Sequence, residues 1–225
     1  MSIPNNTLYL SEVVKYFSGV QKIISSASYC VHNLRELSNH PEGTESLNFK
    51  VKQMLFFKYY AHQMFFISVV ELTKLYAQNG DNHHFCFKQF FHRLENWEYG
   101  EDLKNLLKSN IVSPDAIDQG LTKHLHTSKE SIVSQLISLK KQLDENSESI
   151  QKVLTHRSKL YAHYDKNVSK LTLSISLNDI ECLLELAKSI YYNLHGRIYY
   201  TETNFDFPEP KIKSIIQMIE KGYYL

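Results

Sequence analysis

Residues 178–194, NDIECLLELAKSIYYNL, form the most regular apolar pattern in the chain. Apolar side chains recur there at steps of three and four residues, which is the period of an amphipathic helix. The stripe consists of Ile180, Leu183, Leu184, Ala187, Ile190, Tyr191 and Leu194. Asn178, followed three residues later by Glu181, resembles a capping box. We therefore predict a helix that begins near Asn178 and ends near Leu194.

Similar stripes predict helices on both sides of this run. They extend from Tyr9 to about Leu37, from Glu45 to about Ala77, from a cap at Thr127 or Ser128 to about Leu143, and from Ile212 towards the C-terminus. Shorter helical pieces are expected near Phe85–Leu94 and Glu101–Leu107, inside a less regular region of about 81–127. The predicted fold is all-α: a helical bundle over residues 1–197, followed by a connector and an amphipathic helix over 198–225.

The second of these helices is apolar nearly all round between Met54 and Val70. A helix of this kind is buried on more than one face. It lies either in the centre of a bundle or against a second subunit, and we favour the centre of the bundle.

The composition describes a packed globular protein without an overall charge. Hydrophobic residues make up 43% of the 225 residues, and Lys plus Arg is 25 against 24 Asp plus Glu. Any contact with nucleic acid must therefore be local. The three cysteines, Cys30, Cys86 and Cys182, are odd in number and widely spaced, which indicates a reducing compartment.

The chain shows no pattern typical of secretion or membrane insertion. Its N-terminus lacks the basic start and apolar run of a secretory signal. The densest apolar run, Met64–Val70, is too short to cross a bilayer. We expect a cytoplasmic protein with no membrane segment.

The stretch from Thr155 to Asp165, THRSKLYAHYD, is where we expect chemistry. On a helical projection starting at Ile150, Arg157 falls in the middle of an apolar face. The other members of that face are Val153, Leu154, Tyr161 and Tyr164. A buried, unpaired guanidinium is costly, so Arg157 must meet a carboxylate, a bound anion or a water-filled cleft.

Three further side chains of this stretch carry titratable groups near Arg157. His163 lies six positions later, about 9 Å along a helix axis, and can converge with Arg157 on one ligand. Asp165 can orient an imidazole or pair with Arg157, and either role would shift pKa values. His156 is a weaker candidate, which we expect to face solvent.

The string Arg157-Ser-Lys-Leu-Tyr-Ala-His163 resembles the Arg-x(4 to 6)-His motif of the HEPN superfamily. The longer string from His156 to Lys166, together with the helix after it, is similar to the AbiU-type abortive-infection branch. A weaker similarity extends to the aromatic-rich helix from Glu45 to Ala77, so the resemblance covers most of residues 10–197.

This resemblance implies a helical bundle that dimerises with its motif helices facing each other. It also implies a ribonuclease that needs no metal or other cofactor, in a bacterial defence or toxin–antitoxin system with a possible antitoxin partner. Arg157 would hold the scissile phosphate of RNA. His163 would act as general acid or base while the 2′-hydroxyl attacks, leaving a cyclic phosphate and a 5′-hydroxyl.

Two other readings of the motif stay open. The family often has Asn, Asp or His directly after the arginine, whereas this chain has Ser158, which favours a non-catalytic module that binds RNA or a protein. Alternatively, Arg157 is a structural cation that pairs with Glu71 or Glu185 across the bundle. His163 would then be a histidine near a helix C-terminus, where the helix dipole favours a positive charge.

The remaining polar clusters carry weaker signals. A group of possible metal ligands, His83, His84, Cys86 and His92, lacks the matched spacing of a metal centre, so we predict no metal site. A modest basic cluster, which could touch RNA or simply be solvated, consists of Lys123, His124, His126 and Lys129. The aromatic residues between Phe56 and Phe66 are interpreted as core and not as a base-stacking surface.

Overall fold

The computed structural model describes residues 6–39, 43, 46–77, 84–110, 125–158, 175–199, 201, 203–205 and 211–222. The described chain is built almost entirely of helices, which confirms the all-α prediction. The helices are α1 (Leu10–Ser38), α2 (Leu47–Lys52), α3 (Leu55–Tyr76), α4 (Phe87–Asn96), α5 (Glu101–Ser109), α7 (Lys129–Glu145), α8 (Ser147–His156), α9 (Leu177–Tyr191), the π-helical turn η3 (Tyr192–Gly196), α10 (Arg197–Tyr199) and α11 (Lys211–Glu220).

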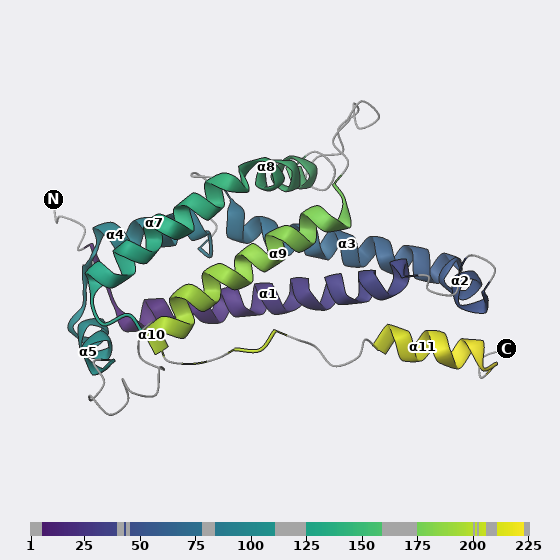
Figure 1. The fold of residues 1–225 in the computed structure, drawn as a ribbon, viewed down its shortest axis with the longest axis horizontal. Coiled ribbons are helices and arrows are strands. Elements are labelled where there is room, and N and C mark those ends of the chain that lie inside the picture. Colours follow the sequence, from purple (N-terminus) through teal and green to yellow (C-terminus); the bar gives the residue numbers. More distant parts are fainter. Residues whose placement is uncertain are drawn as a thin grey trace.

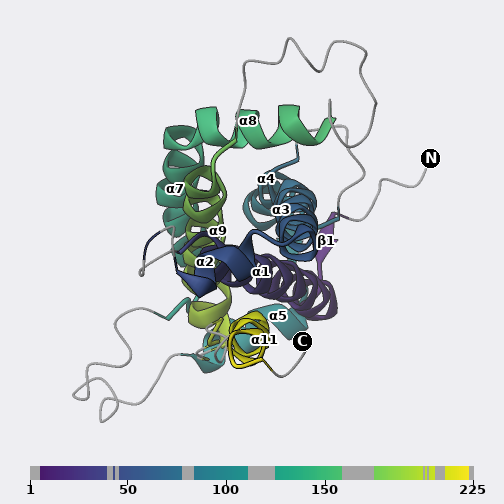
Figure 2. The ribbon, with the colours of Figure 1, turned by 90° about the vertical axis from the view of Figure 1, so that its right-hand side faces the viewer.

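Three long helices, α1, α3 and α9, run side by side along the molecule and enclose the main core (Figure 1). Their buried stripes repeat at the helical period, with Val20, Ile24, Leu72 and Leu183 fully buried. Helix α7 packs on α4, and α8 crosses over α9 and α3 (Figure 2). The predicted stripe of residues 178–194 is therefore the inner face of a central helix.

A two-residue parallel pairing closes one end of the bundle. Strand β1 (Thr7–Leu8) pairs with β2 (Glu98–Tyr99), and Tyr99 donates its hydroxyl hydrogen to the carbonyl of Leu94 at 2.8 Å. The pattern of the sequence did not indicate these strands, because two residues are too few to show an alternation.

The prediction of one helix from Glu45 to Ala77 is wrong, because the chain breaks at Gln53–Met54 between α2 and α3. The cause is a tertiary contact of Lys52, whose side chain is 2% exposed. Its ammonium donates to the backbone carbonyls of Glu36 at 2.6 Å and Asn39 at 2.7 Å, at the end of α1. This contact ties the end of α2 to the end of α1.

The bundle-centre prediction holds for only half of α3. Its C-terminal half is buried, with Val69 and Leu72 both at 0% exposure. At its N-terminal end Leu55 is 83% exposed, Phe56 61% and Tyr59 64%. The described part of this chain does not cover that face, which corrects the expectation of full burial.

Helix α11 docks on the same chain and builds a second, smaller core beside α2 (Figure 1). Ile212 and Ile216 are 3% and 1% exposed there. They pack with Leu37, Val51 and Phe57. The predicted amphipathic helix near the C-terminus is confirmed.

The N-terminus of α9 lies earlier than predicted. Ser176 Oγ accepts the backbone hydrogen of Asp179 at 3.1 Å, and Asp179 accepts that of Ser176 at 2.9 Å. Both Ser176/Asp179 and Asn178/Glu181 have the spacing of a capping box, so the pattern alone could not decide between them. Glu181 instead pairs with Arg35 of α1.

We expect Ser176→Ala to lower the free energy of unfolding by about 1 kcal/mol, because the first turn of α9 loses its side-chain acceptor. Chemical denaturation of the purified variant measures this change. Asn178→Ala is the matched control at the position that the pattern suggested, and its effect should be only a few tenths of a kcal/mol. Equal losses in the two variants would contradict the observed cap.

Candidate functional site

The described part of the motif lies at the C-terminal end of α8, where this helix crosses α3 (Figure 2). Val153, 1% exposed, anchors α8 in the core, and Ile150 packs against the same core. Beyond His156 the backbone continues through Arg157 and Ser158 in a π-helical turn. The core thus fixes the direction in which α8 presents the start of the motif.

Arg157 is only partly buried, and Ser158 is exposed. Among the described residues no carboxylate forms an ion pair with Arg157. The two partners considered for a structural role are engaged elsewhere, since Glu71 bonds Lys74 at 2.6 Å and Glu185 bonds Lys188 at 2.8 Å. Within this part of the chain, the guanidinium remains available for an anion.

His156 packs its ring against the aromatic ring of Phe65 in α3, with ring centroids 6.1 Å apart and planes at 73°. Burial lowers the pKa of His156 below its ordinary value, because the charged imidazolium loses solvation. The expectation that His156 faces solvent is therefore wrong, and its ring joins α8 to α3.

His163 and Asp165, the other two members of the predicted site, lie outside the described residues. The convergence of Arg157 and His163 on one ligand therefore stays a prediction from the sequence.

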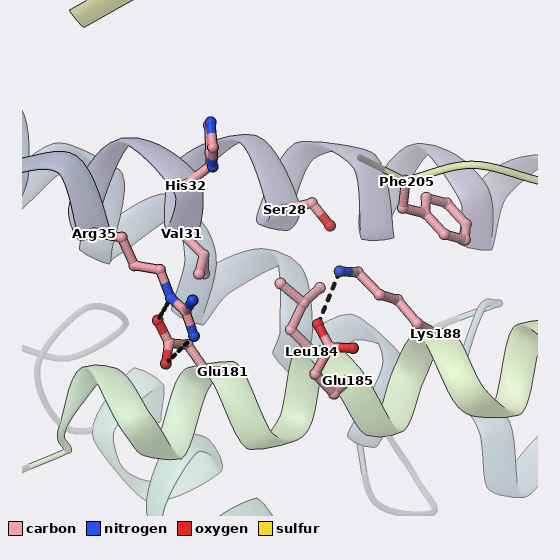
Figure 3. Close-up of a pocket in the computed structure, with 9 residues that line it drawn as sticks. All are labelled: Ser28, Val31, His32, Arg35, Glu181, Leu184, Glu185, Lys188 and Phe205. Carbon is pink, nitrogen blue, oxygen red and sulfur yellow. Dashed lines mark hydrogen bonds and ion pairs between the residues drawn. The ribbon is translucent and has the colours of Figure 1, made fainter. Parts of the chain in front are cut away.

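A polar pocket of about 270 Å³ lies between α1 and α9 and is partly bounded by Phe205 (Figure 3). Its charged side chains pair with one another: Arg35 bonds Glu181 through two nitrogens, and Lys188 bonds Glu185. Ser28 and His32 point to different sides of α1 and do not form a nucleophile–base pair (Figure 3). We call this the α1/α9 pocket, and its paired charges leave no surplus to attract an ion.

Two residues of the basic cluster predicted around 123–129 are described, His126 and Lys129. Both contact the backbone of neighbouring segments and do not form a solvated or RNA-facing surface. His126 is 3% exposed, and its Nε2 lies 3.2 Å from the carbonyl oxygen of Asn193. Lys129 donates to the carbonyl of Trp97 at 2.8 Å. Both residues hold the start of α7 on its neighbours, a role that tertiary packing sets and that charge pattern could not reveal.

The buried His126 should make stability depend on pH. Burial lowers the pKa of His126 to about 4. Between pH 6.5 and 4 the unfolded chain would hold a proton that the folded chain excludes, so stability falls as the pH drops through this range. The free energy of unfolding should therefore be about 3 kcal/mol lower below the folded-state pKa of His126 than above its unfolded-state pKa.

Urea denaturation at a series of pH values tests this expectation. His126→Gln keeps a donor for the Asn193 carbonyl but cannot titrate, so its stability should depend less steeply on pH between 6.5 and 4. A variant whose pH profile runs parallel to that of the wild type would contradict the assignment.

The possible metal ligands that the structure describes do not lie close enough together to bind one metal ion. Cys86 is fully buried and donates to the carbonyl of Ala77 at 2.9 Å, whereas His92 Nδ1 lies 3.0 Å from the side-chain nitrogen of Asn96. Within the described ranges no three His, Cys, Asp or Glu side chains are placed to share a metal ion. His83 lies outside those ranges.

The described helices also contain none with the length and hydropathy needed to traverse a bilayer.

Comparison with known family models, curated proteins and solved structures finds no match to this chain. The resemblance to the HEPN superfamily therefore stays a prediction from the sequence.

Proposed function

We propose that this chain is a HEPN-type endoribonuclease of the AbiU-like branch, which cleaves RNA without a metal in a bacterial defence or toxin–antitoxin system. The observation that carries the proposal is Arg157, which no described carboxylate neutralises at the end of α8. An arginine guanidinium is suited to a phosphate because its planar fork donates two parallel hydrogen bonds.

The proposed reaction divides the work between two side chains. Arg157 holds the scissile phosphate and stabilises the charge that develops on it. His163 takes a proton from the 2′-hydroxyl or gives one to the departing 5′-oxygen. Asp165 orients the imidazole, and His156 supports the helix through its contact with Phe65. The products are a 2′,3′-cyclic phosphate and a 5′-hydroxyl.

We further propose that the active form is a cytoplasmic homodimer. The face at the α2–α3 break that the described residues leave exposed supports self-association, because Leu55, Phe56 and Tyr59 would be shielded from water in a dimer. A toxin of this class would be held in check by an antitoxin protein.

Incubation of the purified protein with mixed RNA in excess EDTA tests the proposal. We expect fragments to accumulate with the wild type and to be absent with His163→Ala. Wild-type protein that leaves all RNA intact would overturn the nuclease proposal.

The second candidate is a non-catalytic module that uses the motif to bind RNA or a partner protein. Ser158, at a position where the family often has Asn, Asp or His, favours this reading. Salt-sensitive RNA binding by the wild type, weakened by Arg157→Ala and without any turnover, would support it over the nuclease.

A further inference from the structure

A groove of about 720 Å³ lies between α1 and α3, beside the turn at His84–Phe85 that precedes α4. Its walls include Lys15, Lys22, Lys74, Gly19 and Phe85. We call it the α1/α3 groove. None of the motif residues that the structure describes, Thr155 to Ser158, lines it.

The α1/α3 groove carries a local surplus of positive charge. Lys15 and Lys22 are exposed, and neither forms an ion pair with a carboxylate of the described chain. Among the described residues that line the groove, Glu71 is the one that is acidic, and it bonds Lys74 at 2.6 Å. Within this described lining three lysines thus face one carboxylate, in a chain whose formal net charge is only +1. The α1/α9 pocket lacks such a surplus because its charges pair (Figure 3).

Lys15 and Lys22 are spaced to follow an extended polyanion. Lys15 and Lys22 are seven residues apart on α1, so they lie on the same face and about 10 Å apart along the helix axis. A polyanion lying along α1 can therefore place one phosphate at each ammonium group.

An aromatic side chain forms the wall beside these cations. The ring of Phe85 lies directly against the backbone of α1, because a Cβ atom at Gly19 would come within 2.0 Å of Phe85 Cε1. Tyr16 holds this turn by donating its hydroxyl hydrogen to the Phe85 carbonyl at 3.3 Å. Phe85 is only partly buried, and it lines the groove.

We infer that the α1/α3 groove binds the backbone of single-stranded RNA, with Lys15 and Lys22 on phosphates and the Phe85 ring against a base. A cationic track beside an aromatic ring is the usual means of holding single strands without sequence preference. The groove and the start of the motif share helix α3: Lys74 follows Phe65, the contact of His156, by nine residues, which places the two side chains roughly 14 Å apart along the axis and on opposite sides of the helix.

This inference rests on the proposed function only in taking RNA as the ligand, so it is tested by binding and not by cleavage. The probe is a fluorescein-labelled 2′-O-methyl oligonucleotide of about 12 nucleotides, within the range of single-strand site sizes. It lacks the attacking 2′-hydroxyl and cannot be cleaved by the proposed reaction. Fluorescence anisotropy gives its affinity for the full-length protein at several salt concentrations.

The test variant is Lys15→Gln/Lys22→Gln, and the matched control is Lys50→Gln/Lys141→Gln. The control removes the same charge from exposed lysines outside the groove. We expect the test variant to bind the probe about ten-fold more weakly than the wild type, with the salt slope reduced by about 1.4, and the control to bind as the wild type does. Phe85→Leu should weaken binding with little change in that slope, because stacking releases no counterions.

Equal affinity and equal salt slopes for the two double variants would overturn the inference, as would a wild type that does not bind the probe. Displacement of the probe by uridine monophosphate as effectively as by unlabelled oligonucleotide would also overturn it, because the ligand would then be a free nucleotide. Binding that depends on Lys15 and Lys22 in a protein that cleaves no RNA would support the groove while rejecting the nuclease.

Discussion

Exchanging Lys52 for methionine lowers the free energy of unfolding by about 3 kcal/mol, because two backbone carbonyls at the end of α1 lose the buried ammonium that donates to them. The ammonium now donates to the carbonyls of Glu36 and Asn39, and it lies 3.3 Å from a side-chain oxygen of Glu36. A helix C-terminus favours a cation at this position through its unpaired carbonyls and its dipole. Methionine keeps most of the apolar stem of Lys52 but supplies no donor.

Urea denaturation of purified Lys52→Met measures this loss. Lys50→Met is the matched control, because Lys50 lies on the same short helix but is exposed. We expect the control to remain within about 0.5 kcal/mol of the wild type. Similar stability for Lys52→Met and the wild type would show that the ammonium does not hold α1 and α2 together.

Replacing Arg157 by alanine reduces the rate of RNA cleavage by about 100- to 1,000-fold in the proposed enzyme, which is typical for loss of one group that stabilises transition-state charge. The fold should survive, because Arg157 is partly exposed and forms no ion pair with a described carboxylate. Single-turnover rates and melting temperatures of the same samples separate the two effects.

Lys152→Ala is the control for Arg157→Ala. It also removes a cation from α8, but Lys152 pairs with Glu148 at 2.9 Å and lies outside the motif. Its cleavage rate should stay within a few-fold of the wild type. A large drop in melting temperature for Arg157→Ala with unchanged specific activity would favour the structural role of the arginine.

The sequence predicts the long helices well, because their stripes are long and regular. The run from Ile180 to Leu194 is buried as its period indicates, and Ile212 and Ile216 face the core from α11. The α2–α3 break could not be predicted, since no glycine or proline marks it and its cause is the contact of Lys52 with a segment 13 to 16 residues earlier. The burial of His126 likewise depends on Asn193, which is 67 residues away.

The candidate site is predicted less completely than the fold. The apolar stripe around Arg157 correctly indicates that α8 buries Val153, but the backbone changes to a π-helical turn at Arg157, and this side chain ends up partly exposed. The α1/α3 groove had one sequence signal, the seven-residue spacing of Lys15 and Lys22. No sequence pattern indicates the aromatic wall of the groove, because Phe85 reaches α1 only through the tertiary fold.

The chemistry at the ends of the RNA fragments tests the central proposal most directly. RNA cut by the wild-type protein in excess EDTA should carry 2′,3′-cyclic phosphate and 5′-hydroxyl ends, which mass spectrometry of the fragments identifies. Those ends require attack by the neighbouring 2′-hydroxyl, as proposed for Arg157 and His163. Fragments with 3′-hydroxyl and 5′-phosphate ends, or no fragments at all, would contradict the account.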